Sequence, residues 1–295
     1  MSDSLTDRPA WATLRGLLEA EGFRPSKSLG QNFLVDANMA RAIARDAQVQ
    51  KGEHVLEVGP GCASLSMELA ALGVDLVCVE IDARLARIAR KVLAPYPAVR
   101  ILETDVLGKK SSLAEPVTEI LDDWGKEPWH LAANLPYAVS GPVMVVLSRR
   151  PVPPNSITVL VQREVAERIA AKPGTRQHGP LGLKLAPLYT ASLVRSVPAG
   201  LFWPQPRVES SVLRLERRAE DPGSLVAYDR LVDGLFQRRR KTLRAALGAH
   251  LGDPGRAGAA LAQAGLDPVA RAETLSWRSL RELEFALAPA EASGS

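Results

Sequence analysis

The sequence predicts an α/β fold in which a doubly wound, mostly parallel sheet is followed by a small α-helical domain. Between residues 54 and 171, short apolar segments typical of buried strands alternate with amphipathic helical segments. Strands that alternate with helices form a parallel sheet with right-handed crossovers. Two later strand patterns suggest an antiparallel edge. After Arg217 only helical spacing is present.

The first predicted helix covers residues 36–47, because Asp36 is a favourable N-cap and Met39, Ile43 and Ala47 fall on one face. The parallel strands are predicted from apolar runs at residues 54–58, 75–80, 99–102, 129–133 and 156–162. The later helices of this region are predicted at residues 64–72, 82–93, 112–124, 142–148 and 163–171. The two late strands are predicted at residues 191–197 and 208–215.

This pattern divides the chain into two predicted domains. Residues 1–23 are expected to form a loose leader, and residues 24–217 the α/β domain. The stretch Ala219-Glu-Asp-Pro-Gly223 is typical of a linker, and residues 224–287 are predicted to form the helical domain. The small and polar residues 288–295 are expected to be a disordered tail.

The composition indicates a globular protein of a reducing compartment. Of the 295 residues, 46% are hydrophobic and 24% are charged, which is too apolar for disorder. Cys62 and Cys78 cannot form a disulfide framework and are expected to be buried free thiols. The four histidines stand apart from other metal-ligating residues, so no metal site is expected. Without a signal-peptide layout or a long apolar run, we expect a cytoplasmic protein with no membrane attachment.

The first candidate site follows the first predicted strand. Glu57-Val-Gly59-Pro-Gly61 is a glycine turn between a strand and a helix, where glycines let the backbone approach a ligand. The dinucleotide fingerprint is not met, because Ser64 replaces its third glycine. Glu80 ends the second strand, where a carboxylate can accept both ribose hydroxyls of a nucleoside. Asp105 follows the third strand, where a carboxylate can accept a hydrogen bond from an adenine amino group.

The ligand that this arrangement predicts is S-adenosylmethionine. Two carboxylates disfavour a pyrophosphate, which is itself negative, and they suit a cationic sulfonium nucleoside that has no phosphate. Taken alone, the glycine segment is equally compatible with a turn that binds no ligand, in which case Glu80 and Asp105 are solvated loop residues. The order of the glycine turn, Glu80 and Asp105 along the chain favours the ligand site.

The second candidate site, Asn134-Leu-Pro-Tyr137, directly follows the fourth predicted strand and is therefore expected at the same edge of the sheet. An amino group on an aromatic ring is a poor nucleophile, because its lone pair is delocalised into the ring. The Asn134 side-chain oxygen and the Leu135 carbonyl can accept its two N–H bonds and favour a pyramidal nitrogen. Pro136 stiffens the loop, and Tyr137 can stack on an extruded base. A plain turn with a core tyrosine is the structural alternative for these four residues.

The motifs together resemble the KsgA-type small-subunit rRNA adenine dimethyltransferases over residues 24–287. The segments that carry the resemblance follow the family's order and are Lys27-Ser-Leu-Gly-Gln-Asn-Phe-Leu34, Glu57-Val-Gly-Pro-Gly61, Glu80, Asp105, Asn134-Leu-Pro-Tyr137, Phe202-Trp-Pro-Gln-Pro-Arg-Val-Glu-Ser210, Phe236-Gln-Arg-Arg-Arg-Lys-Thr-Leu243 and Arg271-Ala-Glu-Thr-Leu-Ser276. One such motif is weak, but the ordered set is not expected by chance.

The resemblance implies a class I methyltransferase (Rossmann-like) domain followed by a small helical RNA-binding domain. The implied substrate is a pair of adjacent adenines in the 3′-terminal hairpin of small-subunit rRNA, each dimethylated at N6, within an immature small ribosomal subunit during ribosome biogenesis. The protein is expected to act as a monomer. The residues implied to contact S-adenosylmethionine are Asn32, Leu34, Gly59, Gly61, Glu80, Asp105 and Asn134. The residues implied to form the catalytic site are Asn134, Leu135, Pro136, Tyr137 and Phe202, of which Tyr137 and Phe202 stack on the base.

Clustered basic residues are predicted to bind RNA. The densest run coincides with a family motif and consists of Arg238, Arg239, Arg240 and Lys241, followed by Arg244. Arg207 stands where the family has a lysine, and smaller clusters are Arg149–Arg150 and Arg214 with Arg217–Arg218. Phosphate contacts of such residues supply affinity, while specificity is expected from rRNA shape and the extruded base. A solvated helix face is the alternative interpretation of the run.

Three other functions are weighed against this one. A large-subunit rRNA adenine methyltransferase of the macrolide-resistance type shares the fold and the Asn134-Leu-Pro-Tyr137 segment, but the long C-terminal region with its Arg271 motif favours the small-subunit family. An RNA-binding assembly factor with little catalysis would not need an intact donor pocket. A DNA adenine methyltransferase usually carries Pro where this chain has Leu135.

Overall fold

The computed structural model describes residues 9–25, 30–109 and 112–288. The chain divides into two compact units, which are Met1–Ala166 with Ser192–Arg217 (unit 1) and Glu167–Ala191 with Arg218–Ser295 (unit 2). The sequence predicts residues 167–191 in the α/β domain, whereas the structure groups them with the C-terminal helices. The reason is local packing, because α8 (Pro180–Leu185) lies against α9 (Val226–Gln237).

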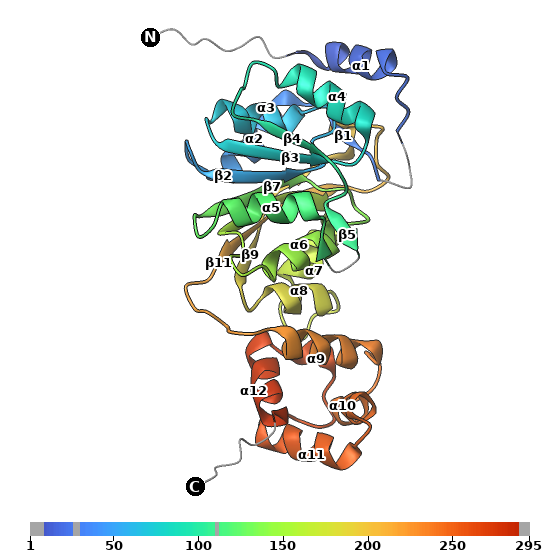
Figure 1. Cartoon of the computed structure of the whole chain (residues 1–295). Coiled ribbons are helices and arrows are strands. Elements are labelled where there is room, and N and C mark those ends of the chain that lie inside the picture. Colours follow the sequence, from blue (N-terminus) through green and yellow to red (C-terminus); the bar gives the residue numbers. More distant parts are fainter. Residues whose placement is uncertain (1–8, 26–29, 110–111, 289–295) are drawn as a thin grey trace. The chain divides into compact units, whose positions relative to one another are not determined.

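Unit 1 is built on a sheet whose strands, within the described residues, follow the order β4-β3-β2-β7-β8-β11-β9 (Figure 1). The strands are β2 (His54–Val58), β3 (Asp75–Glu80), β4 (Arg100–Glu103), β7 (Trp129–Asn134), β8 (Ser156–Gln162), β9 (Tyr189–Val197) and β11 (Ser210–Arg217). The first five of these pair in parallel, whereas β11 runs antiparallel to β8. The predicted doubly wound, mostly parallel sheet is therefore confirmed.

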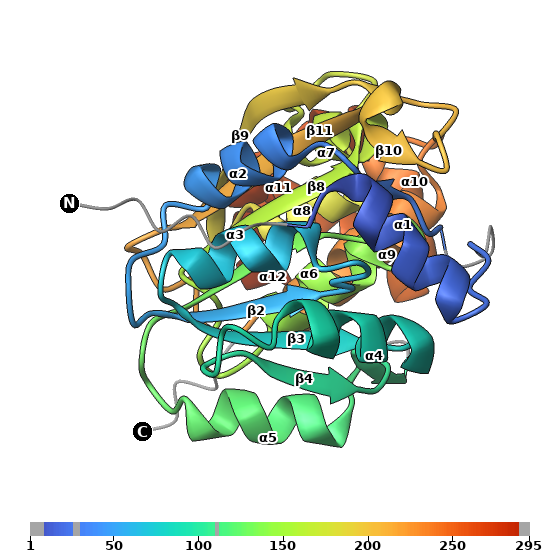
Figure 2. The same cartoon turned by 90° about the horizontal axis from the view of Figure 1, so that it is seen from above.

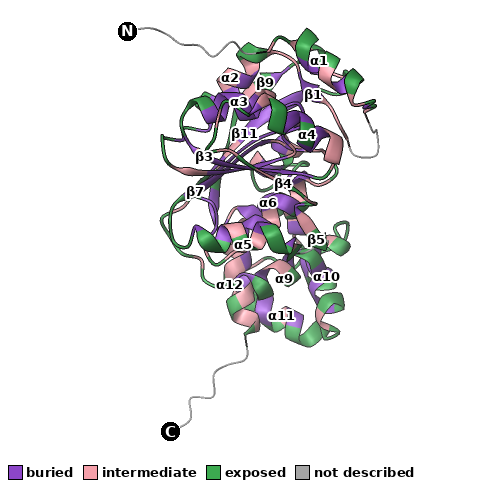
Figure 3. Cartoon of the chain, turned by 45° about the horizontal axis from the view of Figure 1, so that its top comes forward, coloured by how far each residue is buried: buried purple, intermediate pink, exposed green. Residues whose placement is uncertain are grey.

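Helices cover both faces of this sheet (Figures 1 and 3). On one side lie α2 (Ala37–Asp46), α3 (Ser64–Ala71) and α4 (Ala83–Val92), and on the other lie α5 (Glu115–Asp123) and α6 (Ser140–Ser148). Seen from above, β2, β3 and β4 lie side by side, as their pairing requires (Figure 2). The central strands are buried on both faces, which explains why their sequences are continuous apolar runs.

Capping residues fix several helix boundaries where the sequence predicts them. The Asp36 side chain accepts a hydrogen bond from the Met39 N–H at 2.7 Å and begins α2. Asp82 does the same for α4, accepting from the Arg84 N–H at 2.9 Å. Each of these bonds satisfies a donor that the first turn of a helix leaves without a partner inside the helix.

The predicted helix over residues 112–124 is wrong at its start. Ser112–Leu113 form strand β6, which pairs with β5 (Leu107–Lys109), and α5 begins only at Glu115. Ser112 has the chemistry of an N-cap, but Pro116 marks the true first turn, where a proline costs no hydrogen bond. Residues 110–111 lie outside the described residues.

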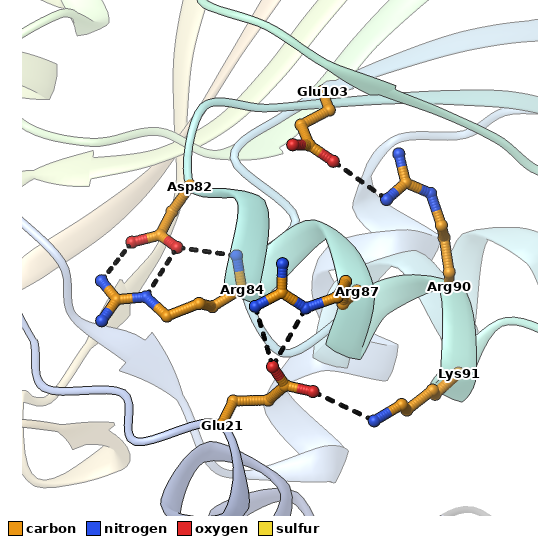
Figure 4. A network of polar contacts seen from close by, with 7 residues as sticks. All are labelled: Glu21, Asp82, Arg84, Arg87, Arg90, Lys91 and Glu103. Atoms are coloured by element: carbon orange, nitrogen blue, oxygen red, sulfur yellow. Dashed lines mark hydrogen bonds and ion pairs between the residues drawn. The ribbon is translucent and has the colours of Figure 1, made fainter.

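The part of the expected leader that the structure describes is not loose. Trp11–Ala20 form helix α1, whose Leu14 and Leu18 are buried. The Glu21 carboxylate that follows accepts hydrogen bonds from Arg87 Nε at 3.0 Å and Lys91 Nζ at 3.1 Å, both on α4 (Figure 4). The prediction of a loose leader missed this helix. α1 is amphipathic, but its N-cap residue, Ala10, has no side chain that can cap a helix, so the sequence contains no start signal. Residues 1–8 lie outside the description.

Two short strands join distant parts of unit 1. β1 (Phe33–Leu34) pairs antiparallel with β10 (Phe202–Trp203), opposing Phe33 to Trp203 and Leu34 to Phe202. β10 directly follows the 3₁₀ helix η1 (Ala199–Leu201). The Phe33 and Trp203 rings are stacked with centroids 6.1 Å apart, and Phe23 meets Phe33 edge-on at 5.6 Å. This aromatic cluster anchors residues 30–34 against the sheet.

Unit 2 is helical, as predicted for the C-terminal part. Besides α8 and α9 it contains α10 (Leu243–Leu251), α11 (Pro254–Gln263), the 3₁₀ helix η2 (Ala272–Thr274) and α12 (Trp277–Leu287), and the unit boundary falls within α7 (Arg163–Ala170). Tyr228 of α9 is fully buried and donates its hydroxyl to the Leu183 carbonyl at 2.8 Å. The expected disordered tail lies outside the described residues from position 289 onward. No helix in the described ranges is long and apolar enough to cross a membrane.

Candidate active site

A cavity of about 190 Å³ lies at the carboxyl ends of β2, β3 and β7 in unit 1. β2 stands between β3 and β7, which is the point where the strand order reverses and where open α/β sheets bind their ligands. The structure brings ten of the predicted site residues to the cavity wall, namely Asn32, Leu34, Gly59, Gly61, Glu80, Asp105, Asn134, Leu135, Pro136 and Tyr137.

The glycine turn after β2 has the backbone conformation that its glycines permit. Gly59 and Gly61 have φ values of 73° and 56°, in the left-handed region that disfavours side chains. A Cβ on Gly61 would lie 2.9 Å from Cδ1 of Phe33, and a Cβ on Gly59 would lie 3.4 Å from Cδ of Pro136. The turn is therefore packed directly between the Phe33 ring and the Asn134-Leu-Pro-Tyr137 segment.

Glu80 ends β3, and the residue is 4% exposed. One oxygen accepts from the Gly61 N–H at 3.1 Å and the other from the Asp82 N–H at 3.0 Å. Burial raises the pKa of this carboxyl above its usual value, against the lowering effect of the two backbone N–H groups. A carboxylate offers about four lone-pair sites, so both oxygens retain capacity for the two hydroxyls of a ribose.

Asp105 stands at the exposed rim of the same cavity. Its Oδ1 accepts from the Leu107 N–H at 3.0 Å, which fixes the loop after β4. Ile81 also lines the cavity and is 53% exposed. In the chain it lies between Glu80 and Asp105. The sequence prediction missed Ile81, although its position directly after Glu80 was a usable signal. A buried carboxylate, an exposed apolar side chain and a rim carboxylate fit a nucleoside that carries a positive charge.

Asn134 ends β7 with its side chain held in one orientation. Its Nδ2 donates to the Asn32 carbonyl at 3.1 Å, and Asn32 in turn donates from Nδ2 to the Gly30 carbonyl at 3.1 Å. A carbonyl oxygen can only accept a hydrogen bond, so the Asn134 atom that faces the Asn32 carbonyl is the amino nitrogen Nδ2. The Asn134 Oδ1 is then the atom available to accept from a ligand at the cavity wall.

The rest of the segment is fixed by the sheet and by Ser210. The Leu135 N–H donates to the Leu160 carbonyl on β8 at 3.1 Å, so the loop leaves the sheet in a defined position. The Tyr137 hydroxyl lies 3.0 Å from Ser210 Oγ, and burial raises the pKa of this phenol. Tyr137 remains half-exposed at the cavity, where its ring offers a face for stacking.

The structure does not bring Phe202 to this cavity. Phe202 is 4% exposed and belongs to the hydrophobic core, whereas its partner across the short strand pair, Leu34, reaches the cavity wall. The expectation that Phe202 stacks on a base is therefore not supported by its position. The pairing of β10 with β1 turns its ring into the apolar interior, which a sequence motif does not reveal.

Several predicted RNA-binding arginines instead support the fold. Arg214 donates to the carbonyls of Asp46 and Ala47 at 2.9 and 2.6 Å, and Arg150 forms an ion pair with Asp122. Arg218 donates to the Ala186 carbonyl and lies 5.5 Å from the centre of the Trp277 ring. Arg149 is half-buried, and Arg217 is exposed and donates to the Pro153 carbonyl at 3.4 Å. The other predicted cations are exposed and are Arg207 in unit 1 and Arg238, Arg239, Arg240, Lys241 and Arg244 in unit 2.

Unit 2 joins three segments into one basic surface, which we call the cationic surface. Arg239 of the run donates to the Arg176 carbonyl at 2.6 Å, and its Nε lies 3.8 Å from Glu273 Oε2. The surface therefore combines the predicted run of Arg238, Arg239, Arg240, Lys241 and Arg244 with the exposed residues Lys172, Arg176 and Arg271. Sequence analysis missed Lys172 and Arg176, because they lie more than sixty residues before the run.

Glu57 is a buried carboxyl that the predicted chemistry does not use. It is 1% exposed, lies beside Cys78 with Sγ to Oε2 at 3.6 Å, and burial raises its pKa to about 7. Both cysteines are buried free thiols, as predicted, and burial raises the Cys62 pKa to about 12.

The raised pKa of Glu57 predicts a pH-dependent stability. The folded protein holds this proton up to about pH 7, whereas the unfolded chain releases it near 4.5, so stability falls as pH rises between these values. The full loss is on the order of 3 kcal/mol. Glu57→Gln is expected to be more stable than wild type at pH 8 and to lose this advantage at pH 4.5. Urea unfolding at both pH values measures the difference, and an equal difference at both would contradict the assignment.

Among the residues that the structure describes, no three His, Cys, Asp or Glu side chains are grouped to hold a metal ion. The polar groups at the cavity are backbone N–H and carbonyl groups, carboxylates, the side-chain amides of Gln31, Asn32 and Asn134, and the hydroxyls of Ser64, Thr104 and Tyr137. This set suits binding of a nucleoside and hydrogen bonding to an amino group.

Comparison with known proteins identifies the family. A model of the family described as ribosomal RNA adenine dimethylase matches residues 22–286. A ribosomal RNA small subunit methyltransferase A from Leifsonia xyli is 44% identical over 273 residues, covering 90% of this chain and 93% of the relative.

Two solved structures share the fold. A dimethyladenosine transferase from Plasmodium falciparum has a TM-score of 0.69 at 20% identity, covering 84% of this chain and 94% of that one. The 23S rRNA methyltransferase ErmE has a TM-score of 0.63 at 28% identity, covering 87% and 100%. The predicted class I methyltransferase fold is confirmed by this likeness and by the sheet. The chain belongs to the ribosomal RNA adenine dimethylase family.

Proposed function

We propose that this protein transfers methyl groups from S-adenosylmethionine to N6 of two adjacent adenines in the 3′-terminal hairpin of small-subunit rRNA. The observation that carries the proposal is the Asn134 amide, whose amino side is bound to the Asn32 carbonyl in a cavity that also contains Glu80 and Asp105. The expected substrate is the immature small subunit in the cytoplasm, and the expected active species is the monomer.

The donor is assigned to the Glu80 side of the cavity. Glu80 is suited to accept the ribose hydroxyls and Asp105 the adenine amino group, while the glycine turn lets the backbone approach. Asn32 and Leu34 close this side from β1. Bound there, S-adenosylmethionine supplies an electrophilic methyl group on a sulfonium.

The chain's own contribution is to make an aromatic amine nucleophilic. In the first transfer, Asn134 Oδ1 and the Leu135 carbonyl accept the two N–H bonds of the target amine, which favours a pyramidal nitrogen with its lone pair directed at the methyl carbon. In the second transfer the monomethylated amine has one N–H left, which one of the two oxygens accepts. The Tyr137 ring stacks on the extruded base. After transfer the nitrogen is positive and acidic, so its proton leaves to water without a strong general base.

RNA binding is assigned to unit 2 together with Arg207 of unit 1. The exposed cations of the cationic surface are suited to phosphate contacts, which supply affinity and register. Arg239 is the exception within the run, because its guanidinium already contacts the Arg176 carbonyl and Glu273. We therefore expect Arg240, Lys241 and Arg244 to contribute more to RNA affinity than Arg239.

The main alternative is the large-subunit enzyme, because ErmE shares the fold. Its 28% identity is lower than the 44% of the small-subunit relative, and the latter matches 93% of its length. The assembly-factor alternative has no comparable support, since binding RNA alone does not require the carboxylates and the Asn134 amide that line the cavity.

One experiment separates the three functions. The protein is incubated with labelled S-adenosylmethionine and either unmethylated small subunits or unmethylated large subunits. We expect label in the small subunits alone. Label in the large subunits alone would instead support the macrolide-resistance type. Tight binding to small subunits without label in either would support the assembly factor.

A further inference from the structure

His178 is a buried histidine of unit 2 with a carbonyl oxygen at each ring nitrogen. Its Nδ1 lies 3.0 Å from the Ala171 carbonyl oxygen, and its Nε2 lies 3.0 Å from the Leu275 carbonyl oxygen. The residue is 5% exposed. Neither the donor cavity nor the predicted RNA contacts include this residue.

The ring lies between two backbone carbonyl oxygens that belong to different segments of unit 2. Ala171 directly follows the last residue of α7, and Leu275 directly follows the 3₁₀ helix η2. The buried side chain therefore bridges the end of α7 and the turn of residues 271–275.

The ring joins the two segments that flank the basic run. On its own side, residues 172–178 form a tight loop in which the Thr175 hydroxyl donates to the Lys172 carbonyl at 2.8 Å. On the other side, Leu275 ends the turn that carries Arg271 and Glu273. The Gly174 N–H donates to the Glu273 carbonyl at 2.8 Å, so the loop and the turn touch at a second point.

The basic run is attached to the same pair of segments. Arg239 donates to the Arg176 carbonyl in the loop, and the Leu243 N–H donates to the Ala270 carbonyl just before the turn, at 2.8 Å. His178 provides the buried contact in this arrangement, whereas the Arg239 contact is exposed and therefore weaker.

We propose that His178 is a positioning residue for RNA binding: it holds the loop of residues 172–178 against the turn of residues 271–275 and thereby assembles the cationic surface. The proposal rests on the proposed function in so far as this surface binds RNA. Its structural part, the contact between loop and turn through His178, stands without it.

The structural part is measured by hydrogen exchange in the full-length protein. The Gly174 N–H, which donates to the Glu273 carbonyl between loop and turn, is expected to exchange faster in His178→Ala than in wild type. An unchanged exchange rate of this N–H would overturn the proposal, because the loop would then be held without His178.

The functional part is measured as the salt dependence of binding to a transcript of the 3′-terminal hairpin. Lys172→Ala/Arg176→Ala is expected to lower the log–log slope by up to roughly 0.9 for each lost phosphate contact in a duplex. His178→Ala is expected to lower the slope by a similar amount, since the loop that carries both residues is released. Combining the two changes is expected to add little to either alone, because they act through the same contacts.

His130→Ala is the matched control. His130 is also buried, with Nδ1 2.8 Å from Ser156 Oγ, but it lies in unit 1. It is expected to lower stability without changing the slope, so a general loss of stability is distinguished from loss of the surface.

The outcomes separate the inference from the proposed function. A wild-type slope in either His178→Ala or Lys172→Ala/Arg176→Ala would overturn the positioning role alone. If His178→Ala does not fold, His178→Gln takes its place in both measurements, and the loop variant is measured as before. Wild-type protein that binds the transcript without any salt dependence would instead contradict RNA binding by unit 2.

Discussion

Asn134→Ala is expected to fold, to bind small subunits as wild type does, and to transfer methyl groups on the order of 10²-fold more slowly or worse. The amide oxygen is proposed to accept from the target amine most strongly as the nitrogen becomes pyramidal. Its loss therefore appears in kcat more than in binding. Single-turnover methylation of unmethylated small subunits measures the effect. Methylation at the wild-type rate would remove Asn134 from the active site.

Tyr137 supplies the matched pair of controls for this segment. Tyr137→Phe keeps the ring and loses only the hydroxyl contact with Ser210, so most activity is expected to be retained. Tyr137→Ala removes the stacking face and is expected to lose both substrate affinity and rate. Equal activities of the two variants would argue that the ring does not contact the base.

Glu80→Ala is expected to weaken binding of S-adenosylmethionine by about 1.5–3 kcal/mol, the usual contribution of a hydrogen bond to a charged group. The carboxylate is buried and is held by the N–H groups of Gly61 in the glycine turn and of Asp82, so no neighbouring group replaces it. Titration calorimetry of the donor measures the change.

Glu103→Ala is the control for Glu80, since Glu103 is the register partner of Glu80 on β4. Its exposed carboxylate forms an ion pair with Arg90 (Figure 4). Its donor affinity is expected to equal that of wild type. An unchanged affinity in Glu80→Ala would refute the assignment of Glu80 to the ribose.

The sheet was predictable because burial on both faces leaves a strong signal. Predicted and observed bounds agree for β2, β3 and β8, whose residues are almost all buried. The order of parallel strands then places the ends of β2, β3 and β7 at one edge. The glycine turn, Glu80 and Asn134 meet there for the same reason.

Elements held only by tertiary contacts were not predictable. β1 and β10 have two residues each and owe their pairing to the aromatic cluster around Phe33. The six-residue helix α8 has no periodic pattern of useful length. Gly182 marks it, since a Cβ there would lie 2.9 Å from the Arg168 carbonyl oxygen, but that close approach is visible only in the fold.

The candidate site shows the same division between local and long-range information. Residues adjacent to strand ends, such as Glu80 and Asn134, were found from their position in the chain. Phe202 was assigned by motif, and the fold buries it. For the basic residues, charge alone did not separate Arg214, whose guanidinium is bound by backbone carbonyls, from exposed Arg240.

The most direct test of the proposed function is identification of the methylated nucleotides. Unmethylated small subunits are incubated with the protein and S-adenosylmethionine, and the rRNA is digested and analysed by mass spectrometry. We expect N6,N6-dimethyladenosine at two adjacent positions of the 3′-terminal hairpin with wild type, and strongly reduced product with Asn134→Ala. Methylation at another base, or at these adenines with equal yield from Asn134→Ala, would contradict the proposed site and its chemistry.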